Sequence, residues 1–207
     1  MGRRKGIAFV ISGPSGAGKT TIAKALLSRL PGLRFSVSAT TRAPRAGERQ
    51  GIDYVFCSSG EFAAMVDAGE LLEWTEYSGH LYGTPQGPVD DLLAEGSDVL
   101  LDIETKGGDN VRRQVPGAVL VFILPPEFAE LGRRIRGRGG VSRSELAARL
   151  NQARIELAKM RKYDYVVVNR CLEEAVDCVT SIIRAERCRV DRQADSFGEL
   201  HERGGAG

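Results

Sequence analysis

Residues 13–20 combine a glycine-rich turn with a lysine and a threonine, a set of groups suited to binding phosphate. They read Gly-Pro-Ser-Gly-Ala-Gly-Lys-Thr and fit the pattern G-x-x-x-x-G-K-[ST] without a mismatch. Glycines let successive backbone N–H groups turn toward phosphate oxygens, and the N-terminus of a following helix adds positive potential. We expect Lys19 to reach the β- and γ-phosphates of a nucleotide and Thr20 to hold Mg²⁺ through its hydroxyl.

A second candidate is the stretch SATTRAPRAGE, residues 38–48, in which Arg42 and Arg45 lie on either side of Pro44. Guanidinium groups match phosphate oxygens two at a time, so two arginines on one short loop can form a phosphate clamp. A solvated, charged turn would have the same composition. The stretch alone leaves both interpretations open.

The residues around the glycine-rich turn predict the elements that such a site needs. Residues 7–12 form a continuous apolar run typical of a strand buried on both faces. Residues 20–30 carry Ile22, Leu26 and Leu30 at helical spacing and stop at a Pro-Gly pair. Apolar runs at 99–103, 118–124 and 165–169 repeat the strand pattern, with helical patterns between them. This alternation predicts an α/β fold with a parallel sheet and helices on both faces.

Two acidic side chains follow one of these apolar runs. Asp102 and Glu104 come at the end of residues 99–103. A phosphate loop is commonly accompanied by a carboxylate at the end of another core strand, which orients the metal and its waters. Asp102 is therefore the candidate for contact with Mg²⁺ through water.

Two regions interrupt the alternation of strands and helices. Residues 35–84 hold short strand-like pieces (35–39 and 53–57) and many turn residues, which predicts a small β-rich insert. Residues 126–162 predict an arginine-rich helix pair, whose second helix begins with Ser142 and Glu145 at capping-box spacing. A final helix, about 172–190, is expected to bury an apolar stripe, and residues 195–207 read as a frayed tail. The apolar stripe of the helix that begins at Ser142 is Leu146, Leu150, Ala153 and Leu157. The stripe of the final helix is Leu172, Val176, Val179 and Ile183, and we expect both to be buried.

Charge and composition narrow the class of protein. Residues 1–60 carry ten basic side chains against two acids, 61–104 carry eleven acids and no Lys or Arg, and 133–162 carry ten basic against two acidic. Two basic arms around an anion fit this distribution, as does plain surface alternation. A nucleic-acid binder is more often basic throughout, and no apolar run approaches the ~20 residues that span a membrane.

The cysteines and histidines suggest neither a zinc site nor a disulfide framework. Four cysteines (Cys57, Cys171, Cys178 and Cys188) show no C-x-x-C pair, and there are two histidines. We expect buried or half-buried thiols and a cytoplasmic protein that binds neither nucleic acid nor membrane. The sequence does not settle oligomeric partners. Trp74 is expected to pack in the core.

Five further stretches resemble the guanylate kinase family, in its bacterial form. They are SVSATTRAPRAGERQGIDYVF (36–56), LLEW (71–74), HLYGTP (80–85), GRG (137–139) and DYVVVN (164–169). The resemblance runs from about residue 7 to 193 with the motifs in the same order. It implies the fold of the P-loop nucleoside-monophosphate kinases, with a parallel sheet flanked by helices, a β-rich acceptor-binding insert and a helical lid. The implied division is a core of 1–34, 85–125 and 163–207, a GMP-binding insert of 35–84 and a lid of 126–162.

The implied activity is transfer of the ATP γ-phosphoryl group to GMP, with Mg²⁺, in purine nucleotide metabolism. The resemblance assigns ATP binding to Gly13, Pro14, Ser15, Gly16, Ala17, Gly18, Lys19, Thr20, Thr21, Arg134, Arg138 and Asn169, the last of these on the adenine side. It assigns GMP binding to Ser38, Arg42, Arg45, Glu48, Tyr54, Glu73, Tyr82, Thr84, Asp102 and Glu104. The charges expected around the transferring group are Lys19, Arg42, Arg134, Arg138 and Arg149.

Two other functions remain to be weighed. A different small-molecule kinase on this scaffold would not need the base-reading set Ser38, Glu73 and Thr84. A catalytically inactive, phosphopeptide-binding relative would be expected to have lost the phosphate loop, whereas Gly18, Lys19 and Thr20 are retained. A GTPase switch is disfavoured because the sequence has no N-K-x-D.

The chain also departs from the family pattern at several positions. Bacterial members usually read D-I-D-x-Q-G, where this chain has Asp102-Ile-Glu104-Thr-Lys106-Gly107, and Arg170 replaces an aspartate that usually follows Asn169. We expect neither Lys106 nor Arg170 to abolish activity.

Overall fold

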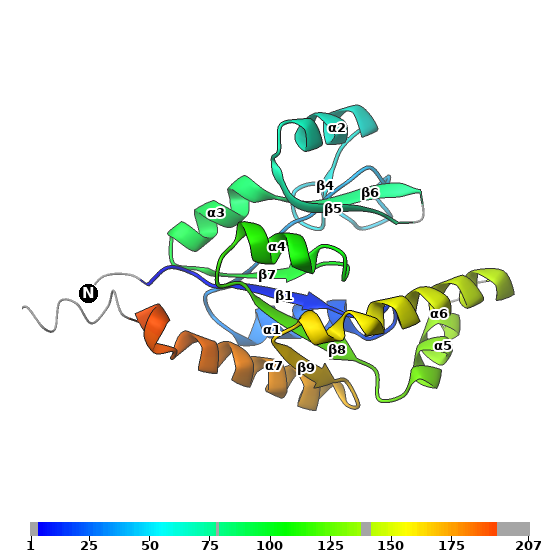
Figure 1. Ribbon diagram of the computed structural model, residues 1–207. Coiled ribbons are helices and arrows are strands. Elements are labelled where there is room, and N and C mark those ends of the chain that lie inside the picture. Colours follow the sequence, from blue (N-terminus) through cyan, green and yellow to red (C-terminus); the bar gives the residue numbers. More distant parts are fainter. Residues whose placement is uncertain (1–3, 78, 138–141, 194–207) are drawn as a thin grey trace, which may run out of the picture.

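The computed structural model describes residues 4–77, 79–137 and 142–193, and its larger sheet confirms the predicted α/β fold (Figure 1). This sheet has five parallel strands: β1 (Ala8–Ser12), β2 (Leu33–Phe35), β7 (Asp98–Asp102), β8 (Val119–Leu124) and β9 (Tyr165–Val168). Their order is β2-β7-β1-β8-β9. Because all five strands run the same way, their carboxyl ends meet at one edge, where α/β proteins place their ligands.

Strand β1 lies at the centre of this sheet and is covered on both faces. Phe9 and Ile11 pack with α1 (Lys19–Arg29) and α7 (Leu172–Arg187). The alternate residues Ala8 and Val10 pack with α3 (Gln86–Ala94) and α4 (Gly108–Gln114). The continuous apolar run therefore has the cause that the sequence suggested, two buried faces.

A second sheet lies within residues 35–85, above the larger sheet in Figure 1. Its strands are β3 (Ala39–Thr40), β4 (Val55–Phe56), β5 (Leu71–Tyr77) and β6 (His80–Pro85), in the order β4-β3-β6-β5. Helix α2 (Ser59–Asp67) buries Phe62 against Ala39 and Leu71. The predicted strand 35–39 is in fact two strands, since Phe35 pairs with Leu100 in the larger sheet and Ala39 begins β3.

Helices α5 (Phe128–Gly137) and α6 (Arg143–Ala158) form the predicted helix pair and project to one side of the core (Figure 1). The pair buries Leu131, Ile135 and Ala153. Ser142 caps α6 by accepting a 3.1 Å hydrogen bond from the N–H of Glu145. The carboxylate of Glu145 pairs with Arg149 at 2.6 Å, so the predicted capping box is only half formed. A short 3₁₀ turn (Met160–Lys162) then leads into β9.

Three expectations about burial are wrong. Trp74 is 48% exposed, because alternate residues of β5 face opposite sides of its sheet and the inward position next to it belongs to Glu73. Cys57 is half-buried as expected, but Cys171, Cys178 and Cys188 are exposed. Of the two stripes expected to be buried, Leu172 is 41% exposed at the start of α7, and Leu146, Leu150 and Leu157 of α6 are only half-buried.

Strand β9 also differs from the other apolar runs. It is an edge strand, and Val166 and Val168 are 46% and 39% exposed while Val167 between them is buried. Composition alone makes β9 look like β8, and only the strand order distinguishes them. Within the described residues, no helix is long and apolar enough to cross a membrane.

Candidate active site

A cleft of about 620 Å³ opens at the carboxyl edge of the larger sheet, between the phosphate loop, the second sheet and α6. It brings together side chains that are far apart in the sequence. Predicted residues that line it are Ser15, Gly16, Gly18, Lys19, Thr20, Thr21, Ser38, Arg45, Tyr54, Glu73, Tyr82, Asp102, Glu104 and Arg149. A smaller adjoining cavity of about 380 Å³ shares Thr20, Ser38, Tyr54 and Asp102 and adds Glu48.

The phosphate loop runs from the end of β1 to the start of α1, as the motif requires. Lys19 donates from Nζ to the carbonyl oxygen of Gly13 at 2.6 Å, which folds its side chain back across the loop. No side chain of the described residues caps α1, and no acid lies in its first turn. The N–H groups at this helix start are therefore available to an anion.

Asn169, at the end of β9, supports this loop from below. Its Nδ2 donates a 2.8 Å hydrogen bond to the carbonyl oxygen of Ala17, and the side chain is buried. Gly18 next to it has a φ of 95°, and a Cβ there would lie 2.4 Å from Asn169 Nδ2. Glycine is required at position 18 both for its backbone angle and for this close approach.

Thr20 and Asp102 supply oxygen ligands of the kind that Mg²⁺ prefers. The Thr20 hydroxyl donates to Asp102 Oδ2 at 2.9 Å, which joins the first turn of α1 to the end of β7. Burial raises the pKa of Asp102, while Lys19 and the Thr20 hydroxyl oppose that shift. A hydroxyl and a carboxylate beside a phosphate loop fit a magnesium ion whose remaining ligands are phosphate oxygens and water.

The predicted arginine clamp is organised around an ion pair. Arg42 makes two hydrogen bonds to the Glu48 carboxylate, at 2.9 and 3.0 Å, and lies over the ring of Tyr54 at 5.3 Å. The rings of Tyr54 and Tyr82 meet edge to face with centroids 6.1 Å apart. Arg45 lines the larger cleft. The Arg42 side chain is thus not solvated, at 11% exposed, whereas residues 43–47 of the loop are exposed.

A buried carboxylate lies on the side of the cleft formed by the second sheet. The Thr84 hydroxyl on β6 donates to Glu73 Oε1 on β5 at 2.7 Å, and both residues are buried. Burial raises the pKa of Glu73 to about 7, with a smaller contribution from Glu104. A Cβ at Gly107 would lie 2.5 Å from Glu73 Oε2, so the backbone after β7 packs directly on this carboxylate.

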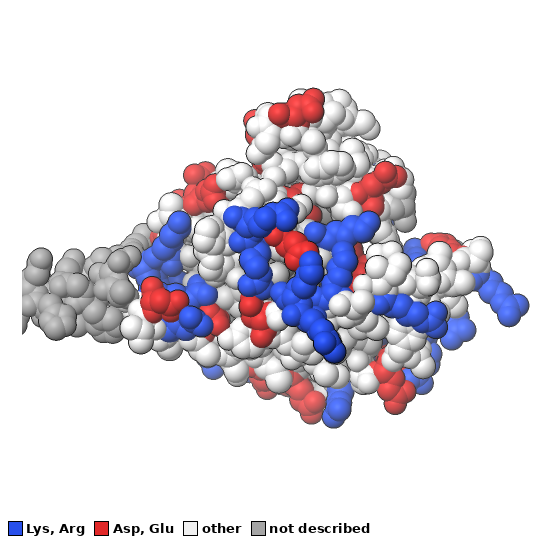
Figure 2. Space-filling model, in the orientation of Figure 1, with Lys and Arg blue, Asp and Glu red and all other residues white. Residues whose placement is uncertain are grey.

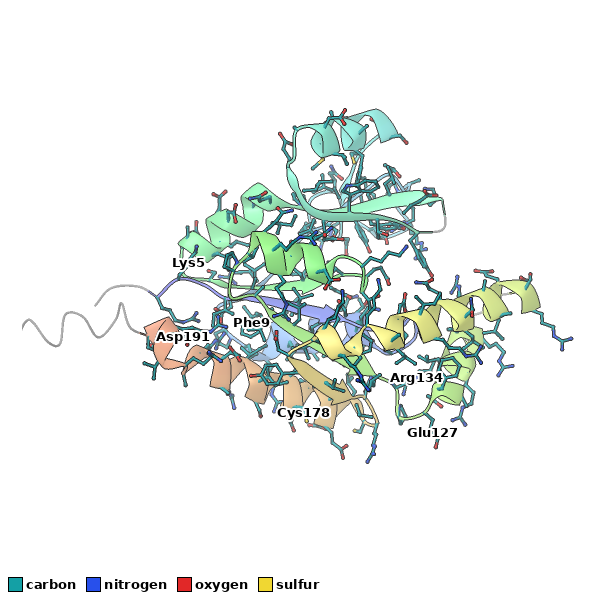
Figure 3. The ribbon with its side chains drawn as sticks, viewed as in Figure 1. Lys5, Phe9, Glu127, Arg134, Cys178 and Asp191 are labelled. Carbon is teal, nitrogen blue, oxygen red and sulfur yellow. The ribbon has the colours of Figure 1, made fainter. Side chains whose placement is uncertain are left out.

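The arginines predicted on the helix pair are placed unevenly. Arg149 lines the cleft and pairs with Glu145. Arg134, on α5 (Figure 3), pairs with Glu130 at 3.0 Å, and its Nη1 lies 4.0 Å from where a Cβ of Gly18 would be. Arg138 lies outside the described residues. On the face shown in Figure 2, basic side chains gather over the middle of the molecule and along α5 and α6.

Some predicted residues support the cleft without lining it. Thr84 lies behind Glu73, Asn169 lies under the loop, and Gly13, Pro14 and Ala17 form the loop's buried side. Lys106 and Arg170, the departures from the family pattern, have exposed side chains.

Sequence reasoning missed four residues that line the cleft, Thr75, Tyr77, Gly83 and Ile103, and a buried acid outside its lining, Glu156. Thr75 and Tyr77 line the cleft two and four residues after Glu73, and the period of a strand could have identified them. Glu156 on α6 is only 5% exposed; burial raises its pKa, Glu104 adds to the shift, and Lys19 opposes it. Glu156 accepts a 3.1 Å hydrogen bond from Gln152 one turn earlier in α6, but its burial depends on segments far away in the chain, so the sequence does not mark it.

Comparisons with known proteins agree with this geometry. The guanylate kinase family model matches residues 5–186. A guanylate kinase from Halalkalibacterium halodurans is 44% identical over 98% of this chain and 99% of its own length. One from Granulibacter bethesdensis is 48% identical over 92% of this chain and 89% of its own. The crystal structure of guanylate kinase from Anaplasma phagocytophilum superimposes with a TM-score of 0.77 at 35% identity, covering 93% of this chain and 92% of that one. The chain belongs to the guanylate kinase family.

Proposed function

We propose that this chain transfers the γ-phosphoryl group of ATP to GMP, giving ADP and GDP, as a step in purine nucleotide metabolism. The observation that carries the proposal is one cleft lined by both the phosphate loop and Glu73, a carboxylate held from behind by the buried Thr84. The phosphate loop selects a nucleoside triphosphate, and the buried pair selects the acceptor. Family membership supports the same assignment.

Glu73 is proposed to read the guanine base. Guanine presents its N1–H and 2-amino group side by side, and a single carboxylate can accept hydrogen bonds from both. Adenine lacks these two donors on that edge, so it would leave the buried Glu73 charge unpaired, which buried polar sites reject strongly. Thr84 fixes the carboxylate through its 2.7 Å hydrogen bond. Ser38 and Thr84 are proposed to complete the contacts with the base.

The remaining charges are proposed to serve the two phosphate groups. Arg42, Arg45, Tyr54 and Tyr82 bind the phosphate of GMP, which brings an ionised oxygen as nucleophile and needs no side-chain base. Lys19, on the loop, neutralises charge on the phosphates of ATP. Arginines from the helix pair neutralise further charge there. The proposed arginines are Arg134, Arg138 and Arg149. Asn169 is proposed to act on the donor nucleotide by supporting the phosphate loop that binds it.

Mg²⁺ is part of the proposal as the cofactor of ATP. Thr20 would bind it directly and Asp102 through water, which fits the oxygen atoms that these two residues bring together. When bound, the ion neutralises phosphate charge during transfer. The protein residues hold the nucleotides in line and exclude water.

The proposal extends to organisation and location. The core, insert and lid are proposed to span the ranges given by the resemblance, with the insert and lid moving toward the loop when nucleotides bind. We propose a cytoplasmic location, where exposed thiols such as Cys171 stay reduced. The partners are ATP and GMP, with no nucleic acid and no membrane.

The test is ADP production from Mg·ATP with GMP, AMP, CMP, UMP and a sugar phosphate offered separately. We expect turnover with GMP alone, apart from weak activity with its deoxy form. Lys19→Met should lower kcat roughly 100-fold or more, because it removes a charge that acts on the transferring group. Lys5→Met, a change at an exposed lysine outside the cleft, is the matched control and should keep full activity.

Two outcomes would overturn the assignment. Turnover with a different acceptor would make the protein another small-molecule kinase and remove the proposed role of Glu73. No turnover with any acceptor, from protein shown to be folded by circular dichroism, would favour the phosphopeptide-binding alternative.

A further inference from the structure

Glu48 makes three hydrogen bonds within the arginine loop, and this arrangement specifies how Arg42 can bind phosphate. Its Oε1 accepts from Arg42 Nη2 at 2.9 Å, and its Oε2 accepts from Arg42 Nη1 at 3.0 Å. The same Oε2 accepts from the backbone N–H of Arg45 at 2.7 Å. One carboxylate thus fixes the side chain of one arginine and the backbone of the other.

The backbone between these residues is built to hold Glu48 in place. The N–H of Glu48 donates to the carbonyl oxygen of Arg45 at 3.0 Å, which closes a four-residue turn. Gly47, the third residue of the turn, has a φ of 88°, as a type II turn requires. A side chain at position 47 would strain this angle and displace the carboxylate.

The hydrogen bonds that Arg42 already makes leave a defined pair of donors. A guanidinium has five N–H donors. Nη1 uses its two on Glu48 and on the carbonyl oxygen of Ala43, the latter at 2.7 Å, and Nη2 uses one on Glu48. The geometric hydrogen bonds of the described residues use neither the Nε–H nor the second Nη2–H, although Tyr82 lies close enough to add to Glu48 in raising the pKa of Arg42. These two donors lie side by side on one edge of the guanidinium plane.

Two aromatic rings also pack against the Arg42 guanidinium, on the same side of it. Its central carbon lies 5.3 Å from the ring centroid of Tyr54 and 5.8 Å from that of Phe56. Aromatic rings hold a guanidinium by cation–π attraction. Glu48 binds in the plane of the group and the two rings pack on one side of it, so the orientation of Arg42 is restricted before any ligand binds.

We propose that Glu48 is a positioning residue. It binds the Nη1 and Nη2 atoms of Arg42, and in this orientation the edge formed by Nε and Nη2 faces the phosphate of the bound nucleoside monophosphate. The inference rests on the proposed function and deepens it. Glu48 has no contact with the base in this arrangement, and its effect on the acceptor passes through Arg42.

A carboxylate close to a phosphate dianion also repels it, so the sign of its net effect is informative. Arg42 and the N–H of Arg45 hold the pKa of Glu48 below its usual range, so that the carboxylate is ionised whenever the protein is near neutral pH. Preorganisation should exceed repulsion, because an unheld arginine loses side-chain freedom on binding phosphate.

The first experiment compares Glu48→Gln, which keeps shape and one acceptor, with wild type in binding GMP and guanosine. We expect Kd and KM for GMP to rise about tenfold, with kcat and KM for ATP within about threefold of wild type. Guanosine, measured as a competitive inhibitor, should bind within twofold of wild type because it carries the base and ribose without phosphate. Glu76→Gln, an exposed glutamate on β5 of the same insert, is the matched control and should change nothing.

A double-mutant cycle then tests whether Glu48 acts through Arg42. In an Arg42→Lys background, Glu48→Gln should raise Kd for GMP by less than twofold, since a lysine has no fork to orient. Glu48→Asp should recover part of the lost GMP affinity, because a carboxylate remains on a shorter arm.

Several results would overturn the inference. They are unchanged or tighter GMP binding by Glu48→Gln, equal weakening of GMP and guanosine, or additive effects of the two substitutions. Wild-type protein that does not phosphorylate GMP would overturn the proposed function itself, whereas an active wild type with an unaffected variant would overturn only the role of Glu48.

Discussion

The Thr84 hydroxyl donates a 2.7 Å hydrogen bond to the carboxylate of Glu73 across the neighbouring strands β6 and β5. The two residues are paired in the sheet register, and both are buried. An acid held in this way has two consequences that can be measured separately, one for stability and one for binding the base.

Stability of the ligand-free protein should fall as pH rises from about 4.5 to 7. Burial raises the pKa of Glu73 to about 7 from the ordinary 4.5, so the folded state binds the extra proton in this window. The free energy of unfolding that protonated Glu73 contributes is fully present below pH 4.5. It amounts to up to about 3 kcal/mol and is lost as pH rises through 7. Urea unfolding of wild type and Glu73→Gln across this range measures the difference. A difference that does not change with pH would contradict the shift.

Binding of the guanine base should change in the opposite direction with pH. The two base donors need the ionised carboxylate, so affinity for guanosine should rise as pH increases from 5 to 7 and level off above. Guanosine is the suitable probe because a phosphate monoester itself titrates near pH 6. Inhibition by guanosine, followed from pH 5 to 9, should lose this dependence in Glu73→Gln.

The support of the phosphate loop by Asn169 predicts weaker ATP binding when the amide is changed. Asn169→Ala leaves the buried carbonyl oxygen of Ala17 without its donor, which costs about 1–3 kcal/mol. We expect a lower melting temperature and a KM for ATP raised at least about fivefold, with Asn169→Asp worse because two acceptors then face each other.

Inorganic tripolyphosphate distinguishes this support from direct contact with adenine. If Asn169 acts through the loop, its variants should weaken inhibition by tripolyphosphate as much as they weaken ATP binding. Loss of ATP binding alone would indicate a contact with the base. Arg170→Ala, at the exposed neighbouring position, is the control.

Asp98 should matter for stability and not for catalysis. It is buried at the end of β7 opposite to Asp102 and binds Arg4, Arg187 and the N–H of Ile7 at 2.6–3.0 Å. Asp98→Asn should cost about 3 kcal/mol, because it leaves buried donors without their charge partner. For a chain of this length that is a fall of roughly 6–12 °C in melting temperature. GMP kinase activity at 25 °C should stay within twofold.

The pH dependence of this effect has the opposite sign to that of Glu73. Burial alone would raise the pKa of Asp98, but the hydrogen bonds from Arg4, Arg187 and Ile7 outweigh it and lower the pKa. The stability that Asp98 provides is therefore present above its unfolded pKa and is lost as pH falls through the folded value. The difference in the free energy of unfolding between wild type and Asp98→Asn should shrink below about pH 4. Asp91→Asn, on the exposed side of α3, should show no gap at any pH.

Lys106 should be neutral for activity, although it departs from the family pattern. Its side chain is exposed, and it lines neither cavity of the site. We expect Lys106→Gln to leave kcat and both KM values within about twofold of wild type in a steady-state assay. A large gain in activity would show that the added charge impairs acceptor binding.

The sequence could predict the elements that local patterns determine. The run 7–12, the loop and the helix after it appear almost as expected, because burial on both faces and the phosphate-loop motif are local properties. The positions of Glu73 and Thr84 followed from the resemblance. Their hydrogen bond did not, because it depends on the register between β5 and β6, which sets two residues eleven positions apart opposite each other.

Other features depend on the assembled fold and could not be read from the chain. Val166 and Val168 look like core residues until the strand order leaves β9 at the edge. Asp98 is a buried acid whose partners, Arg4, Ile7 and Arg187, come from distant segments. The pairing of Arg42 with Glu48 could have been predicted from the sequence, since a short turn joins the two residues.

The hydrogen bond from Asn169 to Ala17 also has a consequence for the order of events during synthesis. The two residues are 152 positions apart, so the phosphate loop leaves the ribosome roughly 8–30 s before the residue that supports it, at 5–20 residues per second. Strand β1 likewise leaves the ribosome before β7 and β8, the strands that pair with it on either side. We therefore expect nascent chains that end before β9 to bind ATP weakly, and ribosome-bound chains stalled at increasing lengths should gain ATP binding only once β9 has emerged.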